Sequence, residues 1–150
     1  MKNALLFFAI ALLAVSGAWA QEHTNLKGGF GAQGYDVVSY FRDEPLKGNK
    51  KISAQFEGVT YKFASEENKT TFLVNPALYI PQYGGFCAYA IAKNGKKVGV
   101  DPKTYTITNG KLYLFYNSWG VNTLDKWNEE GAETLQQKAD AAWNIVLEGQ

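Results

Sequence analysis

The dipeptide Asn109-Gly110 constrains the fold of this 150-residue chain more than any other feature. It separates two runs, residues 105–108 and residues 111–116, in which β-branched, aromatic and aliphatic side chains predominate. An Asn-Gly pair between two such runs favours the type I′ turn of a two-residue β-hairpin, because both turn residues tolerate a positive φ. Residues 105–116 are therefore predicted to form an antiparallel hairpin.

A second hairpin is predicted from residues 52–56 and residues 59–63. Both runs alternate between apolar and polar side chains, and they flank the pair Glu57-Gly58. Two other stretches, residues 37–41 and residues 86–91, are short and mostly apolar or β-branched. They are predicted to be strands or extended segments, which would place the turn before residue 86 at the start of a strand.

A middle helix is predicted between the two hairpins. Ser65 is suited to cap its N-terminus, and Glu66 and Glu67 fall in its first turn, where the helix dipole favours negative charge. Asn75-Pro76 should end the helix, because the residue before a proline avoids the α conformation.

The C-terminal part of the chain is predicted to be an amphipathic helix. Its apolar residues recur at helical spacing along one face, at Leu135, Ala139, Ala142, Trp143 and Val146. Together these elements predict an α+β fold, in which a small antiparallel sheet built from hairpins packs against a middle helix and a C-terminal amphipathic helix.

The N-terminus has the organisation of a secretory signal peptide. A positive Lys2 precedes an apolar run over residues 4–15, and Ala18-Trp19-Ala20 fits the small-x-small cleavage rule. Residues 1–20 are therefore predicted to be removed, which leaves a flexible lead-in over residues 21–33 and a single domain over residues 34–148. We expect an exported protein, periplasmic or secreted, with no stable membrane span after cleavage.

The charge balance argues against nucleic acid as a partner. The chain has 15 basic and 14 acidic side chains, and loss of Lys2 with the signal leaves 14 of each. No basic stripe is present in the sequence, whereas nucleic-acid-binding domains usually carry one.

Cys87, the only cysteine, has no partner for an internal disulfide. It is a thiolate ligand for a soft ion such as Cu(I), a redox-active thiol that an external partner resolves, or a small buried hydrophobe. No histidine, lysine or arginine lies within several residues of it. The residues near Cys87 in the sequence do not distinguish between these three interpretations.

Four separate motifs follow one another in a recognisable order: residues 34–41, residues 61–68, residues 83–90 and residues 109–114. In this order they resemble the YHS-domain family, in its exported stand-alone bacterial form, over most of the chain. The resemblance implies a compact α+β domain that occurs elsewhere beside metal-transporting ATPases and other metal or redox proteins. It also implies chemistry at position 87, because similar members can carry selenocysteine there.

The resemblance and the tyrosine content suggest a pocket near the cysteine. Its expected lining is Tyr35, Asp36, Tyr83, Gly84, Gly85 and Tyr89. The first functional expectation is a domain that binds or senses a soft transition metal, copper first, through Cys87. The alternatives are a thiol-redox protein that uses Cys87, and a structural or small-ligand-binding module in which the thiol is inert. No Ser-His-Asp set, phosphate-binding loop or paired-carboxylate signature is present, so the sequence favours a non-enzymatic domain.

A second candidate metal ligand, His23, is the only histidine of the chain. Cleavage after Ala20 would give a mature chain that begins Gln21-Glu22-His23. A terminal amine, two amide nitrogens and an imidazole at the third position suit Cu(II) or Ni(II), which prefer square-planar nitrogen ligands.

Overall fold

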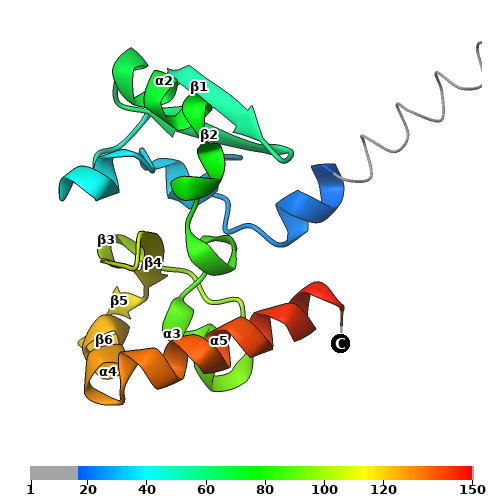
Figure 1. The fold of residues 1–150 in the computed structure, drawn as a ribbon, viewed down its shortest axis with the longest axis vertical. Coiled ribbons are helices and arrows are strands. Elements are labelled where there is room, and N and C mark those ends of the chain that lie inside the picture. Colours follow the sequence, from blue (N-terminus) through cyan, green and yellow to red (C-terminus); the bar gives the residue numbers. More distant parts are fainter. Residues whose placement is uncertain (1–16, 150) are drawn as a thin grey trace, which may run out of the picture.

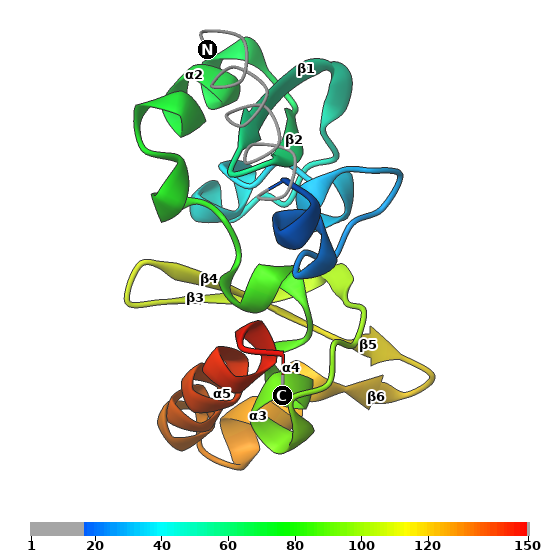
Figure 2. The ribbon, with the colours of Figure 1, turned by 90° about the vertical axis from the view of Figure 1, so that its right-hand side faces the viewer.

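The structure is a computed structural model that describes residues 17–149. Its helices and antiparallel strands confirm the predicted α+β class. Figure 1 shows β1 (Asn49–Phe56), β2 (Val59–Phe63) and α2 (Glu66–Val74) in one half of the molecule. The helices α3 (Ala88–Asn94), α4 (Thr123–Glu129) and α5 (Ala132–Leu147) form the other half. Figure 2 shows that the hairpin of β3 (Asp101–Thr108) and β4 (Lys111–Phe115) crosses between the halves.

Both predicted hairpins are present. Thr108 pairs with Lys111, and Asn109 and Gly110 between them have φ values of 52° and 72°, as a type I′ turn requires. The β1–β2 hairpin turns at Glu57-Gly58, again with two positive φ values. The buried side chains alternate along β2, so that one face of this strand is turned toward the core.

The hairpins do not join into one sheet in the described residues. They form separate two-stranded sheets, together with a third hairpin, β5 (Asn117–Ser118) and β6 (Val121–Asn122), that the sequence did not indicate. Both longer hairpins contain an irregularity near one end, between Asn49 and Ser53 and between Asp101 and Tyr105.

The predicted helices are also present. In α2 the Ser65 hydroxyl accepts a hydrogen bond from the Asn68 amide at 3.1 Å, and the helix gives way at Asn75 to the short 3₁₀ helix η3 (Pro76–Leu78). Helix α5 buries Leu135 and Ala139 and packs against α3. Helix α4, which the sequence pattern did not predict, packs beside them.

The predicted strand over residues 86–91 is wrong. Cys87 is the N-cap of α3, and the chain is helical from Ala88 to Asn94, where Gly95 ends the helix in a left-handed conformation. Three alanines alternate with larger residues here, and alanine is the best helix former. Such a short apolar run does not distinguish a strand from a buried helix by its periodicity.

The extended conformation predicted for residues 37–41 is also wrong, because the chain turns into the 3₁₀ helix η2 (Ser39–Arg42). The buried carboxylate of Asp36 accepts hydrogen bonds from the amides of Val38 and Ser39 at 2.9 and 3.3 Å and so starts the turn. It also accepts from the Ala64 amide and the Asn68 side chain, at 2.8 and 2.7 Å. Asp36 therefore ties η2 to the start of α2.

The stretch predicted as a lead-in, residues 21–33, lies against the domain. Asn25 donates hydrogen bonds from its amide to the Gly84 carbonyl at 2.8 Å and from its side chain to the Gly85 carbonyl at 3.0 Å. Phe30 bridges to Thr60 of β2, beside the short 3₁₀ helix η1 (Gly31–Gly34). The N-terminal segment thus contacts both halves of the molecule.

Most of the predicted signal peptide, residues 1–16, lies outside the described residues. Residues 17–22 are helical. Among residues 17–149 no helix combines the length and apolar character needed to cross a membrane.

Three clusters of buried residues make up the core. One lies among α3, α4, α5 and β4, and a second lies under the β1–β2 hairpin and α2. A third, smaller cluster of Tyr35, Tyr40, Leu112 and Leu114 joins η2 to β4. The β3–β4 hairpin therefore supplies apolar contacts to more than one cluster.

Candidate functional site

Cys87 is fully buried, with no exposed surface. Its sulfur accepts a hydrogen bond from the Tyr116 amide at 3.4 Å and lies 3.3 Å from the Thr123 hydroxyl oxygen. Thr123 donates its hydroxyl proton to the Tyr116 carbonyl at 2.8 Å. The proton between Cys87 and Thr123 therefore comes from the thiol, and the three residues close a ring of hydrogen bonds. This ring joins the start of α3 to the end of β4 and the start of α4.

In the part of the chain that the structure describes, the surroundings of Cys87 contain no ready metal site. Within residues 17–149 no three side chains from histidine, cysteine, aspartate and glutamate come together in a way that could hold a metal ion. The hydrogen-bond partners of the thiol are a hydroxyl and a backbone amide, neither of which is a soft ligand. Copper binding through Cys87 stays a prediction from the sequence.

The six residues predicted to line a pocket near Cys87 lie in several different surroundings in the structure. Tyr83 and Gly84 line a cleft, but Cys87 is not among the residues that line it. Tyr35 lies in the third core cluster and Asp36 forms the buried link to α2. Gly85 is buried and accepts the Asn25 hydrogen bond.

Tyr89, the last of the six, lies in a surface group. Its hydroxyl donates to the Glu130 carboxylate at 2.6 Å, and Lys93 pairs with the same carboxylate at 2.8 Å. The hydrogen bond from Lys93 lowers the pKa of Glu130, and the bond to Glu130 raises the pKa of Tyr89. Since the lysine and glutamate side chains are 47% and 39% exposed, this group is a solvated link between α3 and the end of α4.

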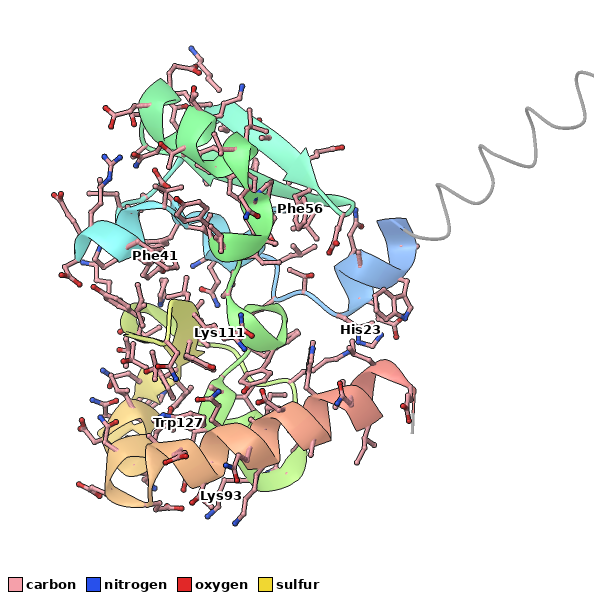
Figure 3. All side chains as sticks on the ribbon, viewed as in Figure 1. His23, Phe41, Phe56, Lys93, Lys111 and Trp127 are labelled. Carbon is pink, nitrogen blue, oxygen red and sulfur yellow. The ribbon has the colours of Figure 1, made fainter. Side chains whose placement is uncertain are left out.

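The cleft has a volume of about 520 Å³ and lies between the two halves of the molecule. One wall comes from the β1–β2 hairpin, through Phe56 and Tyr61, and the opposite wall comes from α5, through Trp143. In Figure 3, Phe56 lies at the end of β1 and His23 lies between the N-terminal helical turn and the end of α5. Lys111, at the start of β4, also lines the cleft.

The glycine pair of η4 (Gln82–Gly85) brings the N-terminal segment to the cleft. Gly84 has a φ of 61°, and a side chain at this position would collide with the His23 carbonyl oxygen. Only glycine accommodates both the left-handed conformation and this close approach without strain. The glycine pair that precedes Cys87 in the sequence is therefore the place where residues 23–25 dock.

A hydrogen bond between Tyr83 and Asp140 lies in the cleft. The Tyr83 hydroxyl donates to Oδ1 of Asp140 at 2.8 Å, and the tyrosine is only 5% exposed. Burial, and then the hydrogen bond to Asp140, raise the pKa of Tyr83 well above its ordinary value. The hydroxyl is therefore a permanent donor, and the exposed Asp140 carboxylate keeps acceptor sites for other partners.

Sequence reasoning missed the part of the cleft that α5 contributes. Asp140, Trp143, Asn144 and Leu147 all line it, and they follow one another at i, i+3, i+4 and i+7. Residues at this spacing share one helix face. The sequence pattern places Trp143 in the apolar stripe that faces the core. An aspartate and an asparagine bordering an apolar stripe are the signal that could have identified this face.

His23 contributes an imidazole to the cleft. Its ring lies 4.8 Å from the Trp19 ring and 6.2 Å from the Trp143 ring, measured between centroids. Its Nδ1 atom is buried and has no hydrogen-bond partner among residues 17–149. Trp19 and Ala20 form part of the adjoining wall.

Comparison with family models, with curated proteins and with solved structures returned no match to this chain. The resemblance to YHS domains stays a prediction from the four sequence motifs.

Proposed function

We propose that this protein is a non-enzymatic small-ligand-binding module, that the cleft between its two halves is the binding site, and that Cys87 has a structural role. The observation that supports this most strongly is the Tyr83–Asp140 pair, which lies in a cleft of about 520 Å³ with aromatic side chains on both walls. A cleft of this size that combines apolar walls with a few polar groups is typical of small-molecule sites.

The lining of the cleft favours one class of ligand. Trp143 and Phe56 offer flat apolar surface, whereas Asp140 offers an exposed carboxylate. A small aromatic amine fits both, because its ring packs against the aromatic walls and its ammonium group donates a charge-assisted hydrogen bond to Asp140. The Tyr83 hydroxyl donates a hydrogen bond to the Asp140 carboxylate and so orients it toward the ligand.

The test uses a panel of small aromatic amines and matched aromatic alcohols, with binding measured by amide chemical shifts. We expect the amines to perturb residues of the cleft and to bind more tightly than the alcohols. Asp140→Asn should weaken amine binding at least about tenfold, since a hydrogen bond to a charged group contributes about 1.5–3 kcal/mol. This variant preserves the shape of the side chain and hence the fold.

The matched control is Trp119→Ala, compared with Trp143→Ala. Trp119 lies at the β5–β6 turn, is 93% exposed and does not line the cleft. Its loss should leave binding unchanged, whereas the loss of Trp143 should weaken it. Equal effects of the two tryptophan variants, or no perturbation of cleft residues by any compound, would disprove the proposal.

The other two interpretations stay predictions. Copper binding and thiol-redox exchange at Cys87 both require a ligand or partner to reach a fully buried sulfur. Copper titration of the wild type and of Cys87→Ser would test the first, because the structural role proposed for Cys87 implies identical titrations. Export to the periplasm or medium likewise stays a prediction from residues 1–20.

A further inference from the structure

His23 differs from the other polar groups of the cleft because its Nδ1 atom is buried and has no partner in the described structure. A buried polar atom without a hydrogen bond costs free energy, so such an atom calls for an explanation. His23 is also the third residue after the predicted cleavage point at Ala20. These two observations, one from the structure and one from the sequence, are independent of each other.

The contacts of residues 21–23 show what cleavage after Ala20 would change. The His23 amide donates to the Trp19 carbonyl at 3.3 Å, and this acceptor would leave with the signal peptide. The Glu22 amide lies in the same helical turns, where the acceptor is four residues earlier and would also leave. Both amide nitrogens would then lack their present partners.

Two carbonyl groups of this segment contact the domain, and so does the Gln21 side chain, which donates to the Gly58 carbonyl at 3.4 Å. Lys97 donates to the Glu22 carbonyl at 3.1 Å, and the His23 carbonyl lies against Gly84. Asn25 then fixes the chain to the carbonyls of Gly84 and Gly85. Cleavage would therefore leave His23 docked on the domain, with its imidazole and the nearby amide nitrogens available to a ligand.

We infer that the mature N-terminus, Gln21-Glu22-His23, is a Cu(II) site, in which the terminal amine, the amide nitrogens of Glu22 and His23, and Nδ1 of His23 bind one ion. Nitrogen donors in a plane are the geometry that Cu(II) prefers. Four copper–nitrogen bonds form, copper gives up water or buffer ligands, and the two amide protons pass to solvent with any proton on the amine. Copper is neither oxidised nor reduced. This site is separate from Cys87 and does not depend on the cleft binding an organic ligand.

The test uses the full chain, exported and processed by a secreting host. Intact mass should correspond to residues 21–150 with a free terminal amine. One equivalent of Cu(II) should then bind with the electron paramagnetic resonance spectrum of a square-planar nitrogen site. Paramagnetic broadening should affect the amide signals around Gly84 and the ring signals of Trp143, because both lie beside His23.

Three variants make the result specific. His23→Ala should no longer bind one equivalent of Cu(II) tightly. An alanine inserted before Gln21 should have the same effect, because it moves the imidazole to the fourth position. Cys87→Ser should keep it. Circular dichroism would confirm that the variants are folded. An intact mass that shows a cyclised Gln21, or cleavage at another position, would overturn the inference. A square-planar copper spectrum that persists in His23→Ala, or that is lost in Cys87→Ser but not in His23→Ala, would also overturn it.

Discussion

Cys87 and Asp36 both place a polar atom in the interior and satisfy it with groups from distant parts of the chain. The Cys87 sulfur contacts Tyr116 and Thr123, which lie 29 and 36 residues away in sequence. The Asp36 carboxylate contacts Ala64 and Asn68, 28 and 32 residues away. In each case the hydrogen bonds add to apolar contacts that already join the same parts of the chain in one core cluster.

The burial of Cys87 predicts that its thiol reacts only when the protein unfolds. A disulfide reagent such as DTNB should leave the folded protein unmodified and should label one thiol per chain in denaturant, because the sulfur has no exposed surface. The measurement is the absorbance of the released thiol over time, with Cys87→Ala as the unreactive control. Stoichiometric labelling of the folded protein on mixing would contradict this and would support the redox interpretation.

At the level of elements, the hairpins were predictable because their turns are determined locally. Asn109-Gly110 and Glu57-Gly58 adopt the positive φ values that their sequence favours. The helical residues 88–94 were not, because a short apolar run is compatible with both a strand and a helix. The hydrogen bonds from Ala64 and Asn68 to the Asp36 carboxylate were not predictable either, because they join distant segments. The α5 sequence carries the polar residues that border its apolar stripe, but it does not indicate which segment lies opposite that face.

The docking of the N-terminal segment on η4 predicts an effect of Gly84→Ala. Alanine must adopt the left-handed conformation, at about 1–2 kcal/mol, and its Cβ must also displace the His23 carbonyl. Gly28→Ala is the matched control, because Gly28 has a φ of 60° but open space around it. Urea unfolding should show Gly84→Ala to be about 1–3 kcal/mol less stable than Gly28→Ala, a cost typical of overpacking.

Gly99→Ala completes this comparison. Gly99 has neither a positive φ nor a neighbour within 4 Å, so its substitution should change the free energy of unfolding little. Equal stability of Gly84→Ala and Gly28→Ala would mean that residues 23–25 do not dock on the glycine pair in solution.

Over the whole molecule, each of the three core clusters contains a buried tyrosine. Tyr61 lies under the β1–β2 hairpin, Tyr83 lies beside α5, and Tyr40 lies between η2 and β4, where its hydroxyl donates to the Pro102 carbonyl at 2.6 Å. Burial is the largest cause that raises the pKa values of these three tyrosines above the ordinary value. The folded state therefore keeps these hydroxyls protonated at alkaline pH values at which the unfolded chain ionises.

This difference predicts a loss of stability at alkaline pH. Below about pH 10, the ordinary pKa of tyrosine, both states are protonated and the free energy of unfolding is unaffected. Above it the unfolded state binds fewer protons than the folded state, so stability falls by up to about 1.4 kcal/mol per pH unit for each such tyrosine. Urea unfolding at a series of alkaline pH values measures the slope, and Tyr61→Phe should make it shallower. A flat profile above about pH 10 would refute the prediction.

The hydrogen bonds from Asn25 to the glycine pair have a consequence for the order of folding. They join Asn25 to residues 59 and 60 positions further along the chain, so they close a long loop. Contacts between such distant residues cost much chain entropy if they form early in folding. The cost is smaller once the intervening part of the chain has already folded. The segment around Asn25 is then among the last parts of the described chain to reach its final position. Until the rest of the domain has formed, this segment stays open to solvent and to other proteins.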